Sequence, residues 1–310
     1  MLITLPRTRI ASLAALCAPE SYLLLVLDCD GTLAPIVPEP SEAAIPPGTL
    51  ASLVLLSTLP RTGIVIISGR SRHTLQSPNL FGETPNLSFA SSHGHFIELD
   101  AALTSSKPRL DGGMPPKPVT HLVGEDAMPM LAIAQTALSA WMASRGPAGL
   151  ALEDTGLSLS LHYRNLVDPN PARLALVEAA VDEAVAASKG VLEKRPGKMV
   201  WELRPRAHWG KGEALGWILE RALQAHKRCA VLCAGDDTTD EDMFTALHKD
   251  APRLASSASI LVCEPLEEGA DTGNVRASAA TSFVSTPEEL ASLLHALAQA
   301  RALATAPAAQ

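Results

Sequence analysis

Four short segments made mostly of apolar residues are spaced along the chain, and each is followed by polar residues. They are Tyr22–Leu27, Arg61–Ile67, Cys229–Ala234 and Ser259–Cys263. Short apolar runs without alternation are typical of strands that are buried on both faces, as in a parallel sheet covered by helices. The pattern predicts helices between them over 47–59, 211–226 and 241–247. Strands that alternate with helices indicate an α/β fold with a doubly wound, Rossmann-like parallel sheet.

The middle of the chain has a different pattern. Helical segments are predicted over 125–144 and 169–188, and each is followed by two short segments in which apolar and polar residues alternate, at 150–153, 157–163, 191–194 and 199–203. The order α-β-β-α-β-β predicts a small antiparallel sheet with two helices on one face. We therefore expect an inserted α+β cap domain over residues 116–204, within a core formed by residues 1–115 and 205–310.

Acidic residues follow the first and the third of the apolar strands. Asp28 and Asp30 lie two residues apart where the first strand ends, so their side chains point to the same side. The third strand is followed by an acidic segment that contains Asp236, Asp237 and Asp240. Because ligands of such sheets bind at the carboxyl ends of the strands, we expect the two groups to meet there.

Carboxylates that are packed together have raised pKa values unless a cation compensates them. A hard divalent cation that leaves room for a phosphate group and water indicates Mg²⁺. A polar turn that merely ends the first strand is the alternative for the first group taken alone. A calcium-binding EF-hand loop is excluded, because its sixth position requires glycine and Leu33 stands there.

Two further segments contain residues that suit a phosphate group. Ser68 and Gly69 follow the second apolar strand and offer a hydroxyl and backbone N–H groups. Lys211 begins a predicted helix and would neutralise a nucleophile or a phosphoryl group. Taken singly, each is more often an ordinary turn or surface residue, and it is their order along the chain that gives them weight.

Composition and charge exclude some classes of function. The net charge of −8 argues against a binder of nucleic acid or of an anionic membrane. No segment supplies the ~20 apolar residues of a membrane span, and Pro19 and Glu20 cut short the apolar run near the N-terminus, so we expect a soluble chain without a cleaved leader. The five cysteines are odd in number and scattered, which favours buried thiols and a cytoplasmic location.

The order of these motifs resembles the haloacid dehalogenase-like phosphatase superfamily. Asp-x-Asp-Gly-Thr is followed by Ser-Gly-Arg, by a lysine and by Gly-Asp-Asp-x-Thr-Asp. Within that superfamily the chain resembles the trehalose-6-phosphate phosphatases from about Tyr22 to Leu294, with further matches at Ser92–Gly94, His162–Arg164, Gly197–Pro205 and Trp209–Gly212. It departs from them at Thr155, where many relatives have lysine, and at Ser91, where glycine is common.

The resemblance implies roles for individual residues. The expected catalytic residues are Asp28 as nucleophile, Asp30 as general acid and base, and Lys211. The expected phosphate-binding residues are Ser68, Gly69 and Arg70. The expected substrate-binding residues are His93, Glu153, Arg164, Lys198 and Glu202. The expected magnesium site comprises Asp28, Asp30 and Asp236, with Asp237 and Asp240 as supporting partners.

The function that the resemblance implies is Mg²⁺-dependent hydrolysis of trehalose 6-phosphate to trehalose and phosphate, through an aspartyl-phosphate. We expect a monomer, with any trehalose-phosphate synthase partner on a separate chain. The alternatives are hydrolysis of another sugar phosphate (sucrose phosphate, a glycosyl-glycerate phosphate or a hexose phosphate), phosphotransfer, and a sugar-phosphate sensor that has lost catalysis.

Overall fold

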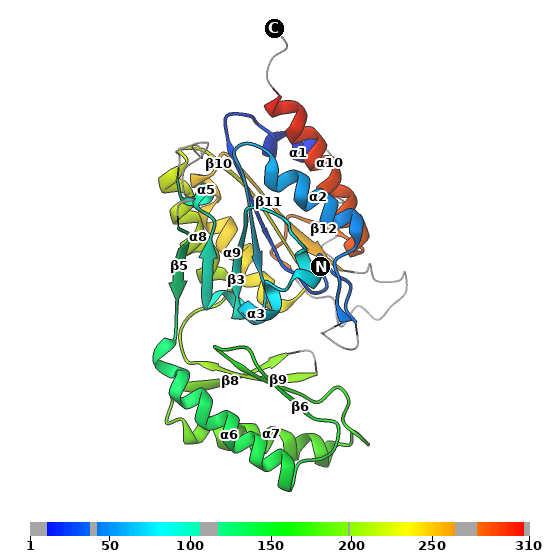
Figure 1. The fold of residues 1–310 in the computed structure, drawn as a ribbon, viewed down its shortest axis with the longest axis vertical. Helices are drawn as coiled ribbons and strands as arrows, with labels where there is room; N and C mark the ends of the chain where they lie inside the picture. The colour runs from blue at the N-terminus through cyan, green and yellow to red at the C-terminus, as the bar shows by residue number, and fades with distance from the viewer. Residues whose placement is uncertain (1–10, 38–41, 106–116, 198, 264–277, 307–310) are drawn as a thin grey trace.

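The computed structural model describes residues 11–37, 42–105, 117–197, 199–263 and 278–306, and these form two β-sheets (Figure 1). The larger sheet contains β1 (Tyr22–Leu27), β2 (Thr62–Ile67), β3 (Leu87–Ser91), β4 (Phe96–Leu99), β5 (Val119–Leu122), β10 (Cys229–Gly235), β11 (Ser256–Val262) and β12 (Ser282–Val284). Its strand order is β12-β11-β10-β1-β2-β3-β4-β5.

The larger sheet is parallel over most of its width. The strands from β12 to β3 pair in parallel, whereas β3, β4 and β5 pair antiparallel at one edge. The predicted α/β fold is therefore confirmed, with an antiparallel edge that the sequence analysis did not predict. The first strand along the chain, β1, lies in the middle of the sheet. The strands β2 and β3 follow on one side of it, and the chain later returns to form β10 on its other side. The carboxyl ends of β1 and β10 thus form the switch point where such sheets bind ligands.

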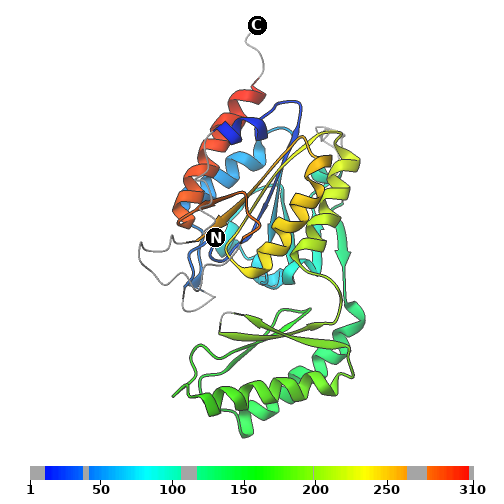
Figure 2. The ribbon, with the colours of Figure 1, turned by 180° about the vertical axis from the view of Figure 1, so that it is seen from behind.

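Helices cover both faces of this sheet (Figures 1 and 2). One face carries α1 (Ala11–Leu16), α2 (Pro47–Thr58) and α10 (Pro287–Thr305), and the other carries α5 (Ala101–Thr104), α8 (Lys211–Ala225) and α9 (Thr238–Asp250). Two further short helices, α3 (Arg72–Leu75) and α4 (Pro78–Phe81), follow β2. Every residue of β1 is buried, and alternate side chains enter the two cores. This two-sided burial is the reason that its sequence is continuously apolar.

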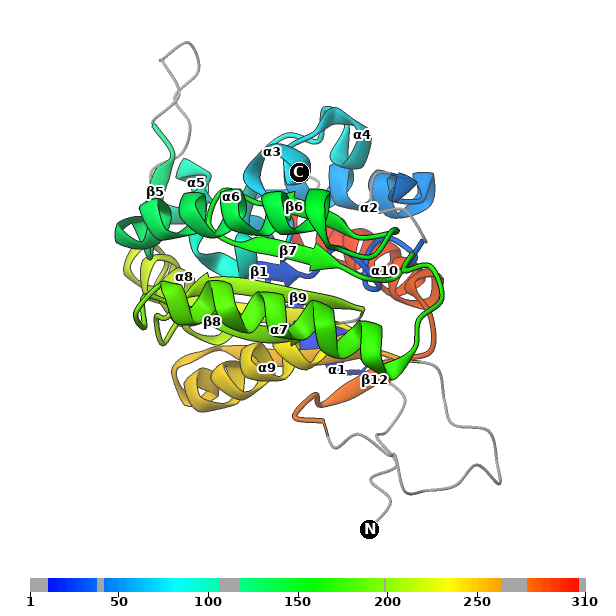
Figure 3. The same ribbon diagram turned by 90° about the horizontal axis from the view of Figure 1, so that it is seen from below.

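The smaller sheet has the strand order β6-β7-β9-β8 and is antiparallel throughout. Its strands are β6 (Ala151–Asp154), β7 (Leu159–His162), β8 (Leu192–Gly197) and β9 (Val200–Pro205), and its helices are α6 (Met128–Ser144) and α7 (Pro171–Ala187). Both helices cover the face that is turned away from the larger sheet, so the open face of the small sheet looks toward the carboxyl ends of β1 and β2 (Figures 1 and 3). The order from α6 onward is α-β-β-α-β-β.

The strand β5 lies within the range expected for the cap but pairs with β4 in the larger sheet. Its residues alternate between half-buried and exposed, as at the edge of a sheet. The smaller unit thus begins after this strand, where the short 3₁₀ helix Glu125–Ala127 leads into α6. That boundary was not visible in the sequence because a four-residue edge strand buries too little to leave an apolar run.

The C-terminal helix α10 is fixed to the N-terminal part of the chain by a buried arginine. Arg301 is fully buried and donates hydrogen bonds to the carbonyl oxygens of Ala18 at 2.7 Å, Ser21 at 2.8 Å and Arg61 at 2.9 Å. Across the part of the chain that the structure describes, no helix combines the length and the apolar character needed to cross a bilayer.

Candidate active site

Three carboxylates from distant parts of the chain meet at the switch point of the larger sheet. Asp28 follows β1, Asp236 follows β10, and Asp240 lies in the first turn of α9. One oxygen of each lies within 4.8 Å of the others. The loop after β1 approaches closely because Gly31 has φ +83° and no side chain; a Cβ there would lie 2.1 Å from Oδ2 of Asp236.

Lys211 forms a buried ion pair with two of these carboxylates. Its Nζ lies 2.7 Å from Oδ1 of Asp28 and 2.8 Å from Oδ1 of Asp240, and its side chain is 3% exposed. The lysine reaches them from the first position of α8, which packs beside α9. Burial lowers the pKa of Lys211, but Asp240 and Asp28 outweigh that effect and raise it, so the lysine remains charged.

The negative charge of the cluster exceeds what one lysine neutralises. Burial raises the pKa of Asp28 well above its usual range; Lys211 lowers it, while Asp240 and Asp236 raise it further. Burial, followed by the charge of Asp240, raises the pKa of Asp236 to about 7. Carboxylates held in this way favour a further cation. Their oxygen donors and their spacing fit a divalent metal ion.

The two oxygens of Asp240 already have partners. Oδ1 accepts from Lys211, and Oδ2 accepts the backbone N–H groups of Asp236 and Asp237 at 3.1 and 3.0 Å. Asp240 therefore holds the loop after β10 in place. Asp237 is the N-cap of α9 and its side chain accepts from Thr238. Among the residues that the structure covers, the cluster brings together Asp28, Asp236 and Asp240, and it includes neither Asp237 nor the Asp30 side chain.

Asp30 is paired with Arg70 rather than with the cluster. The Nε and Nη2 atoms of Arg70 each lie 2.7 Å from one oxygen of the Asp30 carboxylate, which makes a bidentate pair. The Asp30 side chain is 39% exposed, so it faces the open space beside the cluster. Arg70 was expected to bind phosphate, and in this structure its guanidinium is directed to Asp30.

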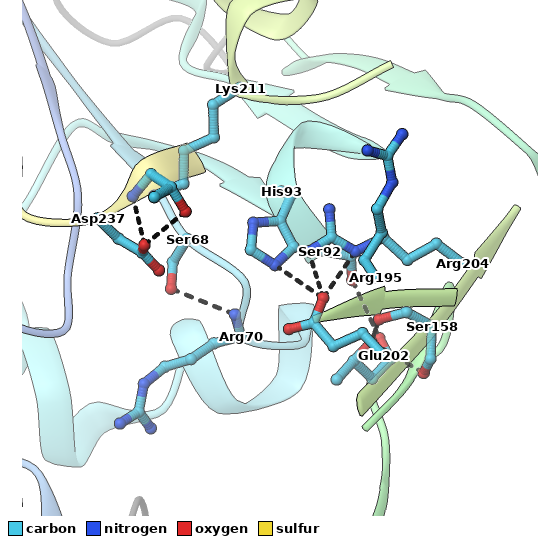
Figure 4. A network of polar contacts seen from close by, with 12 residues as sticks. Ser68, Arg70, Ser92, His93, Ser158, Arg195, Glu202, Arg204, Lys211 and Asp237 are labelled. Atoms are coloured by element: carbon cyan, nitrogen blue, oxygen red, sulfur yellow. Dashed lines mark hydrogen bonds and ion pairs between the residues drawn. The ribbon is translucent and has the colours of Figure 1, made fainter. Parts of the chain in front are cut away.

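The segment after β2 lies against the turn that precedes β4. The hydroxyl oxygen of Ser68 accepts the backbone N–H of Arg70 at 3.2 Å, and the Ser68 side chain is buried (Figure 4). A Cβ on Gly69 would lie 2.6 Å from Nε2 of His93. Glycine is therefore required for this segment, residues 68–70, to approach the imidazole. We call it the phosphate loop below, after the role that the sequence analysis expects of it.

The smaller sheet contributes charged side chains to the same region. Glu202 on β9 accepts from Nε of Arg204 at 2.6 Å and lies 3.5 Å from Nε2 of His93 (Figure 4). Burial raises the pKa of Glu202, but the contacts with His93 and Arg204 outweigh it and hold the pKa far below its usual range. Burial and the charge of Arg204 lower the pKa of His93, so Arg204 is the cation that pairs with Glu202. Glu202 is thus a buried, ionised acceptor on the face that looks toward the phosphate loop.

The other predicted sugar-binding residues have partners of their own. Oε2 of Glu153 lies 3.1 Å from Nε2 of His162, and this contact lowers the pKa of Glu153. Nη1 of Arg164 donates to the carbonyl oxygen of Val37 at 3.2 Å, which connects the smaller unit to the loop after β1. Lys198 lies outside the described residues.

The sequence analysis missed two residues of the site. Arg204 holds Glu202, and its position two residues later on a strand places both side chains on one face, a signal that was available in the sequence. Thr32 donates to Oδ2 of Asp28 at 3.3 Å, and it already belonged to the Asp-x-Asp-Gly-Thr motif.

A cleft of about 950 Å³ leads to Lys211 between the two units. Its lining includes His93, Arg204 and Trp209 as well as acidic residues such as Glu213. Asp28 and Asp236 are not part of the lining, whereas Lys211, which contacts Asp28, is. The cleft is lined by charges of both signs. We therefore assign the chemistry to the carboxylate cluster and not to this cleft.

His95 makes the stability of this region depend on pH. It is 1% exposed, and neither ring nitrogen has a hydrogen-bond partner among the described residues. Burial, with the nearby His93 and Arg204, lowers its pKa to about 4. The folded state therefore favours the neutral ring, and stability is lost as the pH falls from about 6.5 toward 4.

Replacing this histidine should remove that loss. We expect the wild-type free energy of unfolding to fall by roughly 2–3 kcal/mol more than that of His95→Leu between pH 7.5 and 4.5. Urea unfolding at several pH values measures the difference, in which the carboxylates common to both proteins cancel. Parallel pH profiles for the two proteins would show that the ring does not resist protonation.

The sequence and the fold have relatives among known proteins. Residues 26–278 match the family model described as Trehalose-phosphatase. The chain is 31% identical over 230 residues to the trehalose-phosphate phosphatase of Mycobacterium leprae, a match that covers 72% of this chain and 47% of that protein. It is 29% identical over 242 residues to the trehalose-phosphatase of Schizosaccharomyces pombe, covering 78% of this chain and 27% of that protein. The chain thus spans about half, or less, of the length of these relatives.

Solved structures share the fold. The C-terminal domain of Candida albicans trehalose-6-phosphate phosphatase has a TM-score of 0.70 at 22% identity, and the match covers 95% of this chain and 98% of that domain. A structure described as a trehalose-6-phosphate phosphatase related protein has a TM-score of 0.64 at 20% identity, covering 89% of this chain and 97% of that one. At these identities the likeness shows that the chain shares their fold, and it shows nothing further.

Proposed function

Because the chain belongs to the trehalose-phosphatase family, we propose that it hydrolyses trehalose 6-phosphate to trehalose and phosphate. The observation that carries the proposal is the buried contact between Lys211 and Asp28, beside Asp236, at the switch point of the larger sheet. This arrangement offers a carboxylate nucleophile with a fixed positive charge against it. The open face of the smaller sheet, with Glu202, lies opposite and suits a sugar.

Asp28 is the nucleophile in this proposal. One of its oxygens attacks phosphorus, the bond between phosphorus and the sugar oxygen breaks, and an aspartyl-phosphate forms. Asp30 donates a proton to the leaving sugar oxygen, then accepts a proton from the water that hydrolyses the intermediate. Arg70 occupies both oxygens of Asp30 in the structure, so it has to release at least one of them for these transfers.

Lys211, Ser68 and Gly69 hold the phosphoryl group. Lys211 lies 2.7 Å from Asp28, so its charge offsets the repulsion between the carboxylate and the phosphate oxygens. Ser68 is buried within the phosphate loop, where its hydroxyl and the backbone N–H of Gly69 are suitable donors to phosphate oxygens. Stabilisation of charge by fixed groups supplies most of the catalysis in phosphoryl transfer.

We propose Mg²⁺ as the cofactor, held by Asp28, Asp236 and the backbone carbonyl of Asp30, with Asp237 and Asp240 as supporting partners. The raised pKa values of Asp28 and Asp236 support it, since both carboxylates lack full compensation from Lys211 alone. When bound, the ion supplies positive charge beside the phosphoryl oxygens. Preference for a small, oxygen-binding cation follows from a donor set made of carboxylates and a carbonyl.

The smaller unit recognises the sugar through its polar side chains. Glu202, Glu153 and Arg164 present charged groups that can pair with hydroxyls, and an unmatched buried polar group costs about 1–3 kcal/mol. Thr155 is buried, and its hydroxyl donates to the carbonyl oxygen of Ser158 at 3.0 Å. Thr155 therefore faces inward, and it supplies no charge at a position where the resemblance leads us to expect lysine.

The location and the partners follow as proposals from the same reasoning. The free cysteines of the described chain, four of them buried, suit a reducing compartment such as the cytoplasm. The substrate would come from an enzyme that transfers a glucosyl group to a sugar phosphate, and we propose that this synthase is a separate chain. A monomeric state stays a prediction.

A panel of phosphate esters tests the function. Phosphate release is measured from trehalose 6-phosphate, sucrose 6-phosphate, glucose 6-phosphate and p-nitrophenyl phosphate, each with Mg²⁺ and with EDTA. We expect the highest kcat/KM for trehalose 6-phosphate and loss of all activity in EDTA that Mg²⁺ restores. Equal turnover of all esters would refute the disaccharide assignment, and activity that survives EDTA would refute the metal.

A further inference from the structure

The turn between β3 and β4 has an unusual backbone. Ser92 and His93 are consecutive, are not glycine, and have φ values of +49° and +55°. The left-handed conformation is unfavourable for residues that carry a Cβ. Conformations of this kind persist only where the surroundings impose them, and they gather at functional sites.

Their backbone N–H groups hold the phosphate loop. The N–H of Ser92 donates to the carbonyl oxygen of Arg70, and the N–H of His93 donates to that of Ser68, both at 2.9 Å. The imidazole of His93 also packs directly against Gly69. All three residues of the loop therefore contact the turn.

Their side chains reach the smaller unit. The hydroxyl of Ser92 donates to the carbonyl oxygen of Thr155 at 3.2 Å, and Nε2 of His93 lies 3.5 Å from Oε2 of Glu202 (Figure 4). Thr155 belongs to the turn between β6 and β7, whereas Glu202 lies on β9. Ser92 and His93 thus contact two different parts of the smaller unit. Ser92, His93 and Thr155 are each at most 9% exposed, so water does not compete for these contacts.

We propose that Ser92 and His93 are positioning residues that set the spacing between the phosphate loop and the sugar-binding face of the smaller sheet. The left-handed backbone directs the N–H groups to one unit while the side chains reach the other. A substrate that bears both a phosphate and a sugar has to contact both sides at once. This inference rests on the proposed function, because it assigns the turn a role in recognising a sugar phosphate.

The chemistry at position 92 is narrow for this role. The residue has to accept a positive φ and to donate a hydrogen bond across to Thr155. Asparagine meets both requirements, because it is enriched in the left-handed region and its amide is a donor. Alanine keeps the unfavourable backbone and removes the donor, whereas glycine relieves the backbone and also removes the donor.

Three variants of Ser92 test the proposal: Ser92→Ala, Ser92→Gly and Ser92→Asn. For each, kcat/KM is measured with p-nitrophenyl phosphate, which contacts only the phosphate side, and with the sugar phosphate that the wild type hydrolyses best. We expect Ser92→Ala and Ser92→Gly to lose roughly tenfold to a hundredfold on the sugar phosphate alone, mainly through KM. Ser92→Asn should retain the wild-type ratio of the two substrates.

The glycine variant separates positioning from folding. Since it removes the backbone strain, its Tm should equal or exceed that of the wild type while its sugar-phosphate kcat/KM still falls. A wild-type ratio in Ser92→Gly, or equal losses on both substrates in either donorless variant, would overturn the proposal. A wild type that hydrolyses p-nitrophenyl phosphate but no sugar phosphate would instead refute the proposed function.

Discussion

Asp28→Asn is expected to lower phosphate release from every substrate by roughly 10⁴-fold to 10⁶-fold, the range seen when a nucleophile is removed. Asparagine keeps an oxygen that can accept from Lys211, so the geometry of the 2.7 Å contact is preserved while nucleophilic attack is lost. Sugar and aryl phosphates should lose activity equally, because both pass through the same bond to Asp28. Released phosphate, measured at high enzyme concentration, is the readout.

Folding and catalysis respond differently to this substitution. Asp28 is buried, and Asp240 and Asp236 repel its charge. Removing that charge should leave the free energy of unfolding without metal equal to or above that of the wild type. Asp126→Asn, at an exposed position in the smaller unit, is the matched control and should retain full activity. If Asp28→Asn retained a tenth of wild-type turnover, Asp28 would not be the nucleophile.

Lys211→Met is expected to affect stability and catalysis together. The substitution leaves Asp28 and Asp240 buried without their cation, and breaking a buried ion pair from one side costs about 3–5 kcal/mol. Loss of the fixed charge beside the phosphoryl group should lower kcat by roughly 10²-fold to 10³-fold. Urea unfolding and phosphate release measure the two effects.

Added Mg²⁺ gives this variant a second test. If Asp28 and Asp236 hold the ion, saturating Mg²⁺ should stabilise Lys211→Met more than it stabilises the wild type, since the variant has more uncompensated charge. Lys227→Met, which removes an exposed lysine from the segment between α8 and β10, should change neither stability nor activity measurably. Unchanged stability of Lys211→Met in the absence of metal would contradict the buried ion triad.

Most of the fold was accessible from the sequence where burial is two-sided. The strands β1, β2 and β10 and the last four residues of β11 were predicted because they are buried between cores on both faces of the sheet and are therefore mostly apolar. The antiparallel edge was missed, because β4 and β5 have four residues each, and only β4 has fully buried ones. Such edges leave no periodic signal long enough to separate from a loop.

The residues of the site could be predicted from the sequence where they belong to recognisable motifs. Asp28 and Asp236 each follow a predicted strand, so the rule for carboxyl ends of parallel strands brought them together. Lys211 begins a predicted helix, and it was assigned to the site from the order of the motifs along the chain. The partner of each charge was less accessible. Arg70 pairs with Asp30, although its place after Ser68 and Gly69 indicated a phosphate ligand. Pairing between side chains 40 residues apart depends on the loop conformations, which the order of residues does not reveal.

The sequence by itself determined the parallel core, the α-β-β-α-β-β order of the smaller unit and the residue types that carry the chemistry. The reason is that the pattern of apolar residues within each segment reports how that segment is buried. Tertiary structure decided which charges neutralise one another: Lys211 with Asp28 and Asp240, and Glu202 with Arg204. It also decided that Ser92 and His93 adopt a left-handed turn between the two units. These outcomes depend on packing between segments far apart in the chain, where the cost of an unpaired buried charge or a strained residue is offset by contacts that no local pattern contains.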